Sequence, residues 1–263
     1  MCMKGWVLQM SVREDIVYGE GESHLLDIYL PKKRNSFKTM LFFHGGGLEG
    51  GSKEDNRDAF QMLAENGVTV VSANYSTYPR AKYPEFIEDA ALAVNWTFQN
   101  IGTFGACEQL FVAGSSAGAY IAMMLYFDKH YLGKFNIDSN AIGGYVFDAA
   151  QPTTHFNILR ERGLDPRSVI IDGAAPIYHI QENPKHPPIL LIIAERDIPN
   201  RWEQTMLFLS TLKQFGYDDG KIKLKVMRGY QHCGYCHVND QDGRNIYAKI
   251  LQEFLYRERP HVQ

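Results

Sequence analysis

"QLFVAGSSAGAYIAMMLYF", residues 109–127, joins the pattern of a buried strand, a serine flanked by glycines and an apolar helix pattern. Within it, residues 114–118 have the spacing G-x-S-x-G. A chain that passes from strand to helix in so few residues must turn sharply, and a glycine two positions on either side of Ser116 lets the backbones approach. We therefore expect Ser116 to project from a strained turn, with the N-terminus of a helix directed at it.

Strand and helix patterns alternate along the rest of the chain. Residues 24–31 alternate apolar and polar side chains, as in a half-exposed strand. Other strands are predicted at 39–44, 69–75, 109–114, 143–150, 187–197 and 221–227, and helices at 54–66, 85–101, 119–127, 202–215 and 245–257. This order predicts an α/β fold with a mostly parallel sheet of about eight strands, helices on both faces, and the early strands at an edge where they can pair antiparallel. We expect a single domain over residues 1–263, with the irregular stretch 151–186 forming a small cap or lid.

Composition excludes several classes of partner. The chain has 263 residues, 45% hydrophobic and 22% charged, with a net charge of −3. This charge gives no reason to expect nucleic acid or an anionic membrane as a partner.

The N-terminal "MCMKGWVLQMSVRED" lacks the apolar core of a signal peptide, so we expect a cytoplasmic protein. Four cysteines are too few for a disulfide framework, and Cys2 and Cys107 have no obvious partners. Oligomeric state cannot be read from these properties.

A second glycine motif ends an earlier strand. "FFHGGG", residues 42–47, closes with three glycines, which allow backbone N–H groups to point into a site without obstruction by Cβ atoms. The N–H groups of Gly45 and Gly46, joined by that of Ala117 directly after the serine, could bind a developing oxyanion. Two glycine motifs at strand ends, in this order, favour a hydrolytic site over ordinary turns.

A serine hydroxyl needs a base to act as a nucleophile, and the base needs an acid to orient it. Glu195 and Asp197 follow one late strand pattern, and His232 follows the next, so these side chains gather where the carboxyl ends of parallel strands meet. We assign Asp197 as the acid, because it lies further along the loop, with Glu195 as the alternative. We assign His232 as the base, with His237 as its competitor.

The segment "QHCGYCH", residues 231–237, also matches other patterns. Its C-x-x-C-H and C-x-x-C spacings occur in haem attachment sites and in redox dithiols, and its Cys and His content suits zinc. A redox pair needs a strand followed by a helix N-terminus, haem attachment an exported protein, and a closed zinc site ligands from two separated segments. The sequence meets none of these conditions, so we interpret Cys233 and Cys236 as neighbours of the catalytic base, where oxidation of Cys233 could disturb His232.

Together these motifs resemble the α/β-hydrolase fold, and specifically the esterase and lipase group related to hormone-sensitive lipase. The stretch 72–96, "SANYSTYPRAKYPEFIEDAALAVNW", resembles the segment of that group between oxyanion loop and nucleophile. The resemblance spans roughly residues 20–257 and concerns fold and mechanism rather than substrate. One departure is Ser115, where the lipase-like members often carry Asp. The compact length resembles small carboxyl, acetyl and feruloyl esterases.

The resemblance implies hydrolysis of small or short-chain acyl or aromatic esters by Ser116, His232 and Asp197, with no metal or cofactor. Since His232 must be neutral to act as base, the rate should rise with pH through about 6.5–7.5. An arylformamidase-like hydrolase is the alternative within the enzymes, although those usually carry an aromatic residue in the oxyanion motif, where this chain has Gly47-Leu48. A non-catalytic binding protein of the same fold is the alternative from another class.

Overall fold

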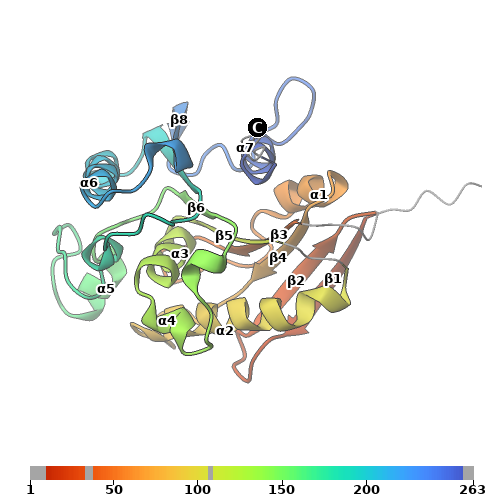
Figure 1. Ribbon diagram of the computed structural model, residues 1–263, viewed down its shortest axis with the longest axis horizontal. Helices are drawn as coiled ribbons and strands as arrows, with labels where there is room; N and C mark the ends of the chain where they lie inside the picture. The colour runs from red at the N-terminus through yellow and green to blue at the C-terminus, as the bar shows by residue number, and fades with distance from the viewer. Residues whose placement is uncertain (1–9, 33–37, 106–108, 257–263) are drawn as a thin grey trace, which may run out of the picture.

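An eight-stranded sheet organises the molecule in a computed structural model, which describes residues 10–32, 38–105 and 109–256 (Figure 1). Its strand order is β1-β2-β4-β3-β5-β6-β7-β8. The strands are β1 Ser11–Val17, β2 Leu25–Leu30, β3 Lys38–Phe43, β4 Thr69–Ala73, β5 Gln109–Ser115, β6 Tyr145–Asp148, β7 Ile189–Arg196 and β8 Ile222–Gln231. The helices are α1 Arg57–Glu65, α2 Glu85–Asn100, α3 Ala117–Phe127, α4 His130–Gly133, α5 Phe156–Glu161, α6 Arg201–Gln214 and α7 Ile246–Leu255. Short 3-10 turns lie at Ile101–Thr103, Ser139–Ala141, Pro176–His179 and Asp219–Lys221.

The pairing of the strands confirms the predicted fold class. Strands β3 to β8 pair in parallel, while β1 with β2 and β2 with β4 pair antiparallel at one edge. The sequence pattern did not predict β1, because three of the seven residues of its "SVREDIV" are charged, most are exposed, and the apolar alternation of a strand is lacking. Pairing with β2, rather than burial, forms this strand.

Helices cover both faces of the sheet (Figure 1). Alternate strand residues point to opposite faces, so each strand contributes to two cores. Leu41 and Phe43 of β3 pack in the core under α2 and α3, whereas Met40 and Phe42 pack in the core under α1 and α7. Burial on both faces explains why the central strands read as nearly continuous apolar runs. None of the described helices combines the length and apolar composition of a membrane-crossing segment.

Helix α3 is buried along its whole length, with all 11 residues in the core. It packs against the sheet and against α2, and its first residue directly follows Ser116. Because β5, β7 and β8 are parallel, the residues that follow them emerge at the same edge of the sheet. This edge carries the candidate site.

The stretch 151–186 holds α5 and the Pro176–His179 turn among irregular residues. It contacts the body of the fold at two tyrosines: Tyr120 of α3 donates to the carbonyl oxygen of Ala174 at 2.7 Å, and Tyr83 donates to that of Gly173 at 3.0 Å. These bonds hold the stretch against α3 and the segment that precedes α2. The predicted single domain with a cap at 151–186 stays a prediction. Cys2, Cys107 and most of the N-terminal stretch considered as a signal peptide lie outside the described residues.

Candidate active site

Ser116 occupies the turn between β5 and α3 with φ 53° and ψ −113°. A non-glycine residue at positive φ is strained and persists only where its surroundings impose it. A Cβ atom on Gly118 would lie 2.0 Å from the carbonyl oxygen of Phe43, and one on Gly114 would lie 2.3 Å from the backbone of Gly118. Both glycines of the G-x-S-x-G motif are therefore required for the close approach of strand and helix that exposes the serine.

The structure brings together the three side chains that the sequence singled out. His232 follows β8, and its Nε2 lies 2.9 Å from Ser116 Oγ. Its Nδ1 lies 2.6 Å from Oδ1 of Asp197, which follows β7. The side chain of Asp197 is 2% exposed and that of His232 is 24% exposed. The buried carboxylate thus holds the imidazole, whose other nitrogen faces the serine hydroxyl. In this arrangement the neutral imidazole would donate from Nδ1 and accept from the serine at Nε2.

The alternative acid and base lie elsewhere. Glu195 accepts a hydrogen bond from the backbone N–H of Gly229 at 2.8 Å, which ties β7 to β8 away from the imidazole. His237 is exposed at the surface. The geometry therefore favours Asp197 over Glu195 and His232 over His237.

Contacts shift the pKa values of the imidazole and the acid. Burial alone would lower the pKa of His232, but hydrogen bonds to Asp197 and Cys233 outweigh it and raise this pKa above its usual range. Burial alone would raise the pKa of Asp197, but the bond to His232 and the N–H of Ile198 lower it. The pair therefore favours imidazolium and carboxylate. Because of this pairing, His232 loses its proton at higher pH than the window of about 6.5–7.5 expected from an unperturbed imidazole.

The glycine loop after β3 lies beside the serine. A Cβ atom on Gly45 would lie 3.3 Å from the Ser116 Cβ, and Gly46 has φ +104°, which only glycine adopts readily. His44 is buried and stacks on Tyr75, whose hydroxyl donates to the His44 carbonyl oxygen at 2.8 Å. These contacts fix the loop that presents the N–H groups of Gly45 and Gly46.

Helix α3 adds the third donor of the predicted oxyanion site. The N–H of Ala117 belongs to the first residue of the helix and so has no acceptor within it. Hydrogen bonds among the described residues leave the three N–H groups of Gly45, Gly46 and Ala117 without an acceptor. These donors are thus available to a substrate oxygen.

The cysteine-rich loop wraps behind the histidine. Cys233 and Cys236 are both free thiols, and Cys233 Sγ lies 3.2 Å from Ser115 Oγ. Hydrogen bonds to Cys236 and His232 hold the pKa of the Cys233 thiol well below its usual range. Within the described ranges, no group of three His, Cys, Asp or Glu side chains is placed to hold a metal ion. The loop therefore places a thiol against the imidazole.

Sequence analysis missed a buried carboxyl group at this edge, that of Asp148 at the end of β6. It is fully buried and accepts hydrogen bonds from Ser115 Oγ at 2.8 Å and from the Tyr235 hydroxyl. Burial raises the pKa of Asp148 to about 8. The signal was present in "YVFD", residues 145–148, where an acidic residue ends an apolar strand, but its partners come from tertiary contacts.

Part of the stretch 151–186 lies over the glycine loop. The ring of Phe156 would be 3.2 Å from a Cβ atom on Gly47, and Arg160 pairs with Glu49 at 2.5 Å. Helix α5 therefore flanks the glycine loop.

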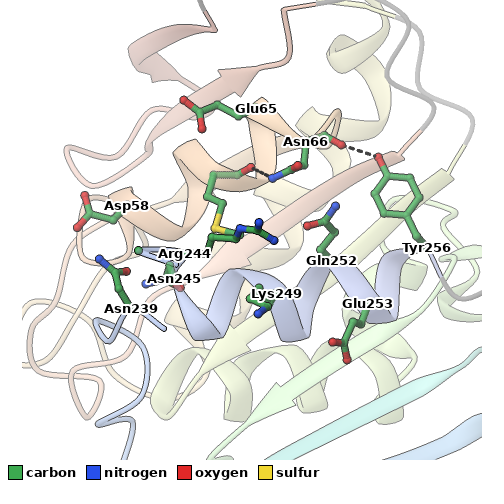
Figure 2. Close-up of a pocket in the computed structure, with 12 residues that line it drawn as sticks. Asp58, Glu65, Asn66, Asn239, Arg244, Asn245, Lys249, Gln252, Glu253 and Tyr256 are labelled. Carbon is green, nitrogen blue, oxygen red and sulfur yellow. Dashed lines mark hydrogen bonds between the residues drawn. The ribbon is translucent and has the colours of Figure 1, made fainter. Parts of the chain in front are cut away.

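A separate groove of about 760 Å³ lies between α1 and α7, away from the serine (Figure 2). Its labelled side chains include Asp58, Glu65, Arg244 and Lys249, and Tyr256 closes one end by donating to the carbonyl oxygen of Asn66 at 3.1 Å. The groove has polar walls and contains no nucleophile paired with a base. It does not compete with the Ser116 edge as a catalytic centre.

Comparison with known sequences identifies related proteins. Residues 26–144 match the family model described as BD-FAE. Over 113 residues the chain is 33% identical to a probable isoprenylcysteine alpha-carbonyl methylesterase of Oryza sativa subsp. japonica, which covers 42% of this chain and 27% of that protein. Over 112 residues it is 30% identical to a kynurenine formamidase of Danio rerio, covering 42% and 37%. Esterase LipC of Mycobacterium tuberculosis is 26% identical over 232 residues, covering 78% and 57%. The chain thus spans about a quarter of the length of the methylesterase it matches.

Solved structures share the fold. Esterase B of Lactobacillus rhamnosis superposes with a TM-score of 0.75 at 16% identity, covering 94% of this chain and 85% of that chain. Esterase Est2 of Thermogutta terrifontis, solved with propionate bound, superposes with a TM-score of 0.72 at 21% identity, covering 94% of each chain. Both likenesses extend over nearly the whole of this chain.

Proposed function

From its α/β-hydrolase fold and its sequence similarity to esterases of that fold, we propose that this chain hydrolyses carboxylic esters through an acyl-enzyme on Ser116. The observation that carries the proposal is the continuous contact from Ser116 Oγ through His232 to Asp197, at 2.9 Å and 2.6 Å. These are the distances at which a serine proton can pass to an imidazole held by a carboxylate.

Acylation begins when Ser116 Oγ attacks the ester carbonyl carbon. The serine proton moves to His232 Nε2, and Asp197 stabilises the resulting imidazolium. The negative charge on the former carbonyl oxygen is bound by the N–H groups of Gly45, Gly46 and Ala117, each worth about 2.7–4 kcal/mol in comparable sites. When the tetrahedral intermediate collapses, His232 returns the proton to the leaving alcohol.

Deacylation repeats these steps with water as the nucleophile. His232 takes a proton from water as its oxygen attacks the acyl carbon, and the same donors hold the second oxyanion. Collapse breaks the bond between the acyl carbon and Ser116 Oγ, and His232 returns the proton to the serine oxygen. The products are the carboxylic acid and the free enzyme.

We propose small or short-chain acyl or aromatic esters as substrates. The ring of Phe156 and the Arg160–Glu49 ion pair lie against the glycine loop and limit the room beside it. The propionate bound to the Thermogutta esterase is a small acyl product of the kind proposed here. Formamide hydrolysis is the second candidate, favoured by the 30% identity to the kynurenine formamidase over 112 residues.

An ester panel on the wild type and Ser116→Ala tests the proposal. The panel holds p-nitrophenyl acetate, longer acyl esters, methyl ferulate and N-formylkynurenine. We expect turnover of short or aromatic esters in the wild type and a loss of about 10⁴-fold or more in Ser116→Ala, because the nucleophile is removed. Ser210→Ala, at an exposed serine of α6, serves as the matched control and should keep full activity. Equal turnover by Ser116→Ala would refute the proposal, and preferential turnover of N-formylkynurenine would favour the second candidate.

A further inference from the structure

The carboxyl group of Asp148 lies behind the proposed catalytic residues, among side chains of two different segments. We name Ser115, Asp148, Cys233, Tyr235 and Cys236 the Asp148 cluster. Asp148 pairs in register with Ser115 across β6 and β5, so the two side chains project on the same face of the sheet. The Ser115 hydroxyl donates to Asp148 Oδ2 at 2.8 Å, and the Ser116 backbone N–H donates to the Asp148 carbonyl oxygen at 2.7 Å. Asp148 thereby holds the turn that carries the nucleophile.

The same carboxyl group also holds the loop that carries the imidazole. The Tyr235 hydroxyl donates to Asp148 Oδ1, and Cys236 Sγ lies 3.8 Å from Oδ2. Tyr235 is fully buried and lies three residues after His232. Two backbone hydrogen bonds, Gly234 N–H to Gln231 and Cys236 N–H to Cys233, close the turns between them. The position of the Tyr235 ring therefore constrains where His232 can lie.

We propose that Asp148 is a positioning residue that sets the distance between Ser116 and His232, an inference that rests on the proposed function. Ser116 and His232 come from segments separated by 116 residues, which meet directly at the Ser116–His232 contact of 2.9 Å and at the contact of Ser115 Oγ with Cys233 Sγ of 3.2 Å. A single carboxyl group that contacts both segments adds a further connection, buried behind the reacting pair. A misplacement of about 1 Å at a reacting pair can cost about 10²-fold in rate, so such a connection acts on catalysis as well as on folding.

A positioning role and a purely structural role of Asp148 predict changes in different measured quantities. A buried hydrogen bond that only stabilises the fold alters the fraction of folded protein, and each folded molecule keeps its full rate. A positioning bond alters the rate of each folded molecule and leaves substrate binding nearly unchanged. The readouts are therefore kcat per fluorophosphonate-titrated serine, KM, and the second-order rate constant of fluorophosphonate labelling.

The test compares Asp148→Asn and Tyr235→Phe with the wild type. Asn keeps the shape of the side chain but replaces one acceptor oxygen by an NH₂ group, and Phe removes only the Tyr235 hydroxyl. We expect each variant to lose about 10-fold to 100-fold in kcat per titrated serine and in labelling rate, with KM within about twofold. Tyr29→Phe is the matched control, because Tyr29 is equally buried and its hydroxyl has no hydrogen-bond partner among the described residues. It should keep the full labelling rate.

The possible outcomes separate the positioning role of Asp148 from the proposed esterase function. Unchanged kcat and labelling rate per folded molecule in both variants would overturn the positioning role and leave the proposed function standing. A wild type that neither hydrolyses esters nor labels at Ser116 would refute the proposed function itself. If Asp148→Asn is recovered only unfolded, Tyr235→Phe decides, with a reduced labelling rate supporting the inference and an unchanged rate overturning it.

Discussion

Two buried aspartates at neighbouring strand ends of one sheet have opposite electrostatic environments. Asp197, after β7, contacts the His232 imidazole and has a lowered pKa, whereas Asp148, at the end of β6, contacts hydroxyl and thiol groups and has a raised pKa. Both side chains are almost fully removed from water. Burial by itself favours the neutral acid in both cases, so the partner decides the charge. The comparison shows that the contact of a carboxyl group, rather than its place at a strand end, decides whether it can stabilise an imidazolium.

Removal of the charge at Asp197 should have the largest effect of any single substitution at an aspartate. Asp197→Asn is expected to lower kcat by about 10⁴-fold, because an amide at this position favours the wrong imidazole tautomer and cannot stabilise the imidazolium. Initial rates with p-nitrophenyl acetate at saturating substrate measure it. Glu195→Gln is the matched control, because Glu195 lies two residues before Asp197 and its carboxylate accepts from the Gly229 N–H rather than from the imidazole. This variant should lose less than about threefold in kcat. A larger loss in Glu195→Gln than in Asp197→Asn would reverse the assignment of the acid.

The two aspartates should also act oppositely on the pH dependence of stability. The folded-state pKa of Asp148 is raised to about 8. The stabilisation that the neutral carboxyl group gives the fold is therefore fully present below the unfolded-state pKa near 3.8 and is lost as pH rises toward 8. As pH rises from 5 to 8, the free energy of unfolding of Asp148→Asn should therefore increase relative to that of the wild type, by at most about 1.4 kcal/mol per pH unit. Urea unfolding of both proteins at the two pH values measures this difference.

The contribution of Asp197 to the pH dependence of stability has the opposite sign. Since its folded-state pKa is lowered, its stabilisation is present above the unfolded value and is lost as pH falls through the folded value. Between pH 5 and pH 8 the Asp197 carboxyl group is ionised in both the folded and the unfolded state, so it adds no slope of its own, and any change of slope in Asp197→Asn over this range comes from a lower pKa of His232. Equal slopes for Asp148→Asn and the wild type would show that Asp148 is ionised in the folded protein throughout this range.

Substitution of Cys233, whose thiol lies near both aspartates, should have the smallest effect. It should change only the pH profile of the reaction. The Cys233 thiol, whose pKa is lowered, helps to raise the pKa of His232. Cys233→Ser removes this acidic group, so the imidazole should lose its proton at lower pH, and the midpoint of the rise in kcat/KM should fall by about one unit. Profiles from pH 5 to 10 on the wild type and the variant measure the midpoint. A midpoint that is unchanged or higher would contradict the pairing of thiol and imidazole.

The proposed catalytic residues could be read from the sequence because each directly follows a strand pattern. Ser116 follows an apolar run and lies between two glycines, while Asp197 and His232 follow the last two strands, so parallel topology alone brings them to one edge. The choice of Asp197 over Glu195 and of His232 over His237 rests on contacts in the folded chain, which sequence spacing does not determine: Glu195 accepts from the Gly229 N–H, and His237 is exposed.

The Asp148 cluster could not be predicted in the same way. Its contacts depend on the register of β5 against β6 and on a turn after β8 that returns Tyr235 beneath the sheet edge. Likewise, the charged β1 forms only through its pairing with β2. Both features arise from tertiary contacts between segments whose local patterns carry no sign of the partner.

The most direct measurement traps the acyl-enzyme. The wild type is mixed with a short-chain p-nitrophenyl ester, quenched in acid within the first turnover and digested for peptide mass analysis. The account predicts a mass increase equal to one acyl group on the peptide that contains Ser116, and none in Ser116→Ala. An acyl group carried instead by Cys233, or an ester hydrolysed with no adduct at Ser116 on any time scale, would contradict it.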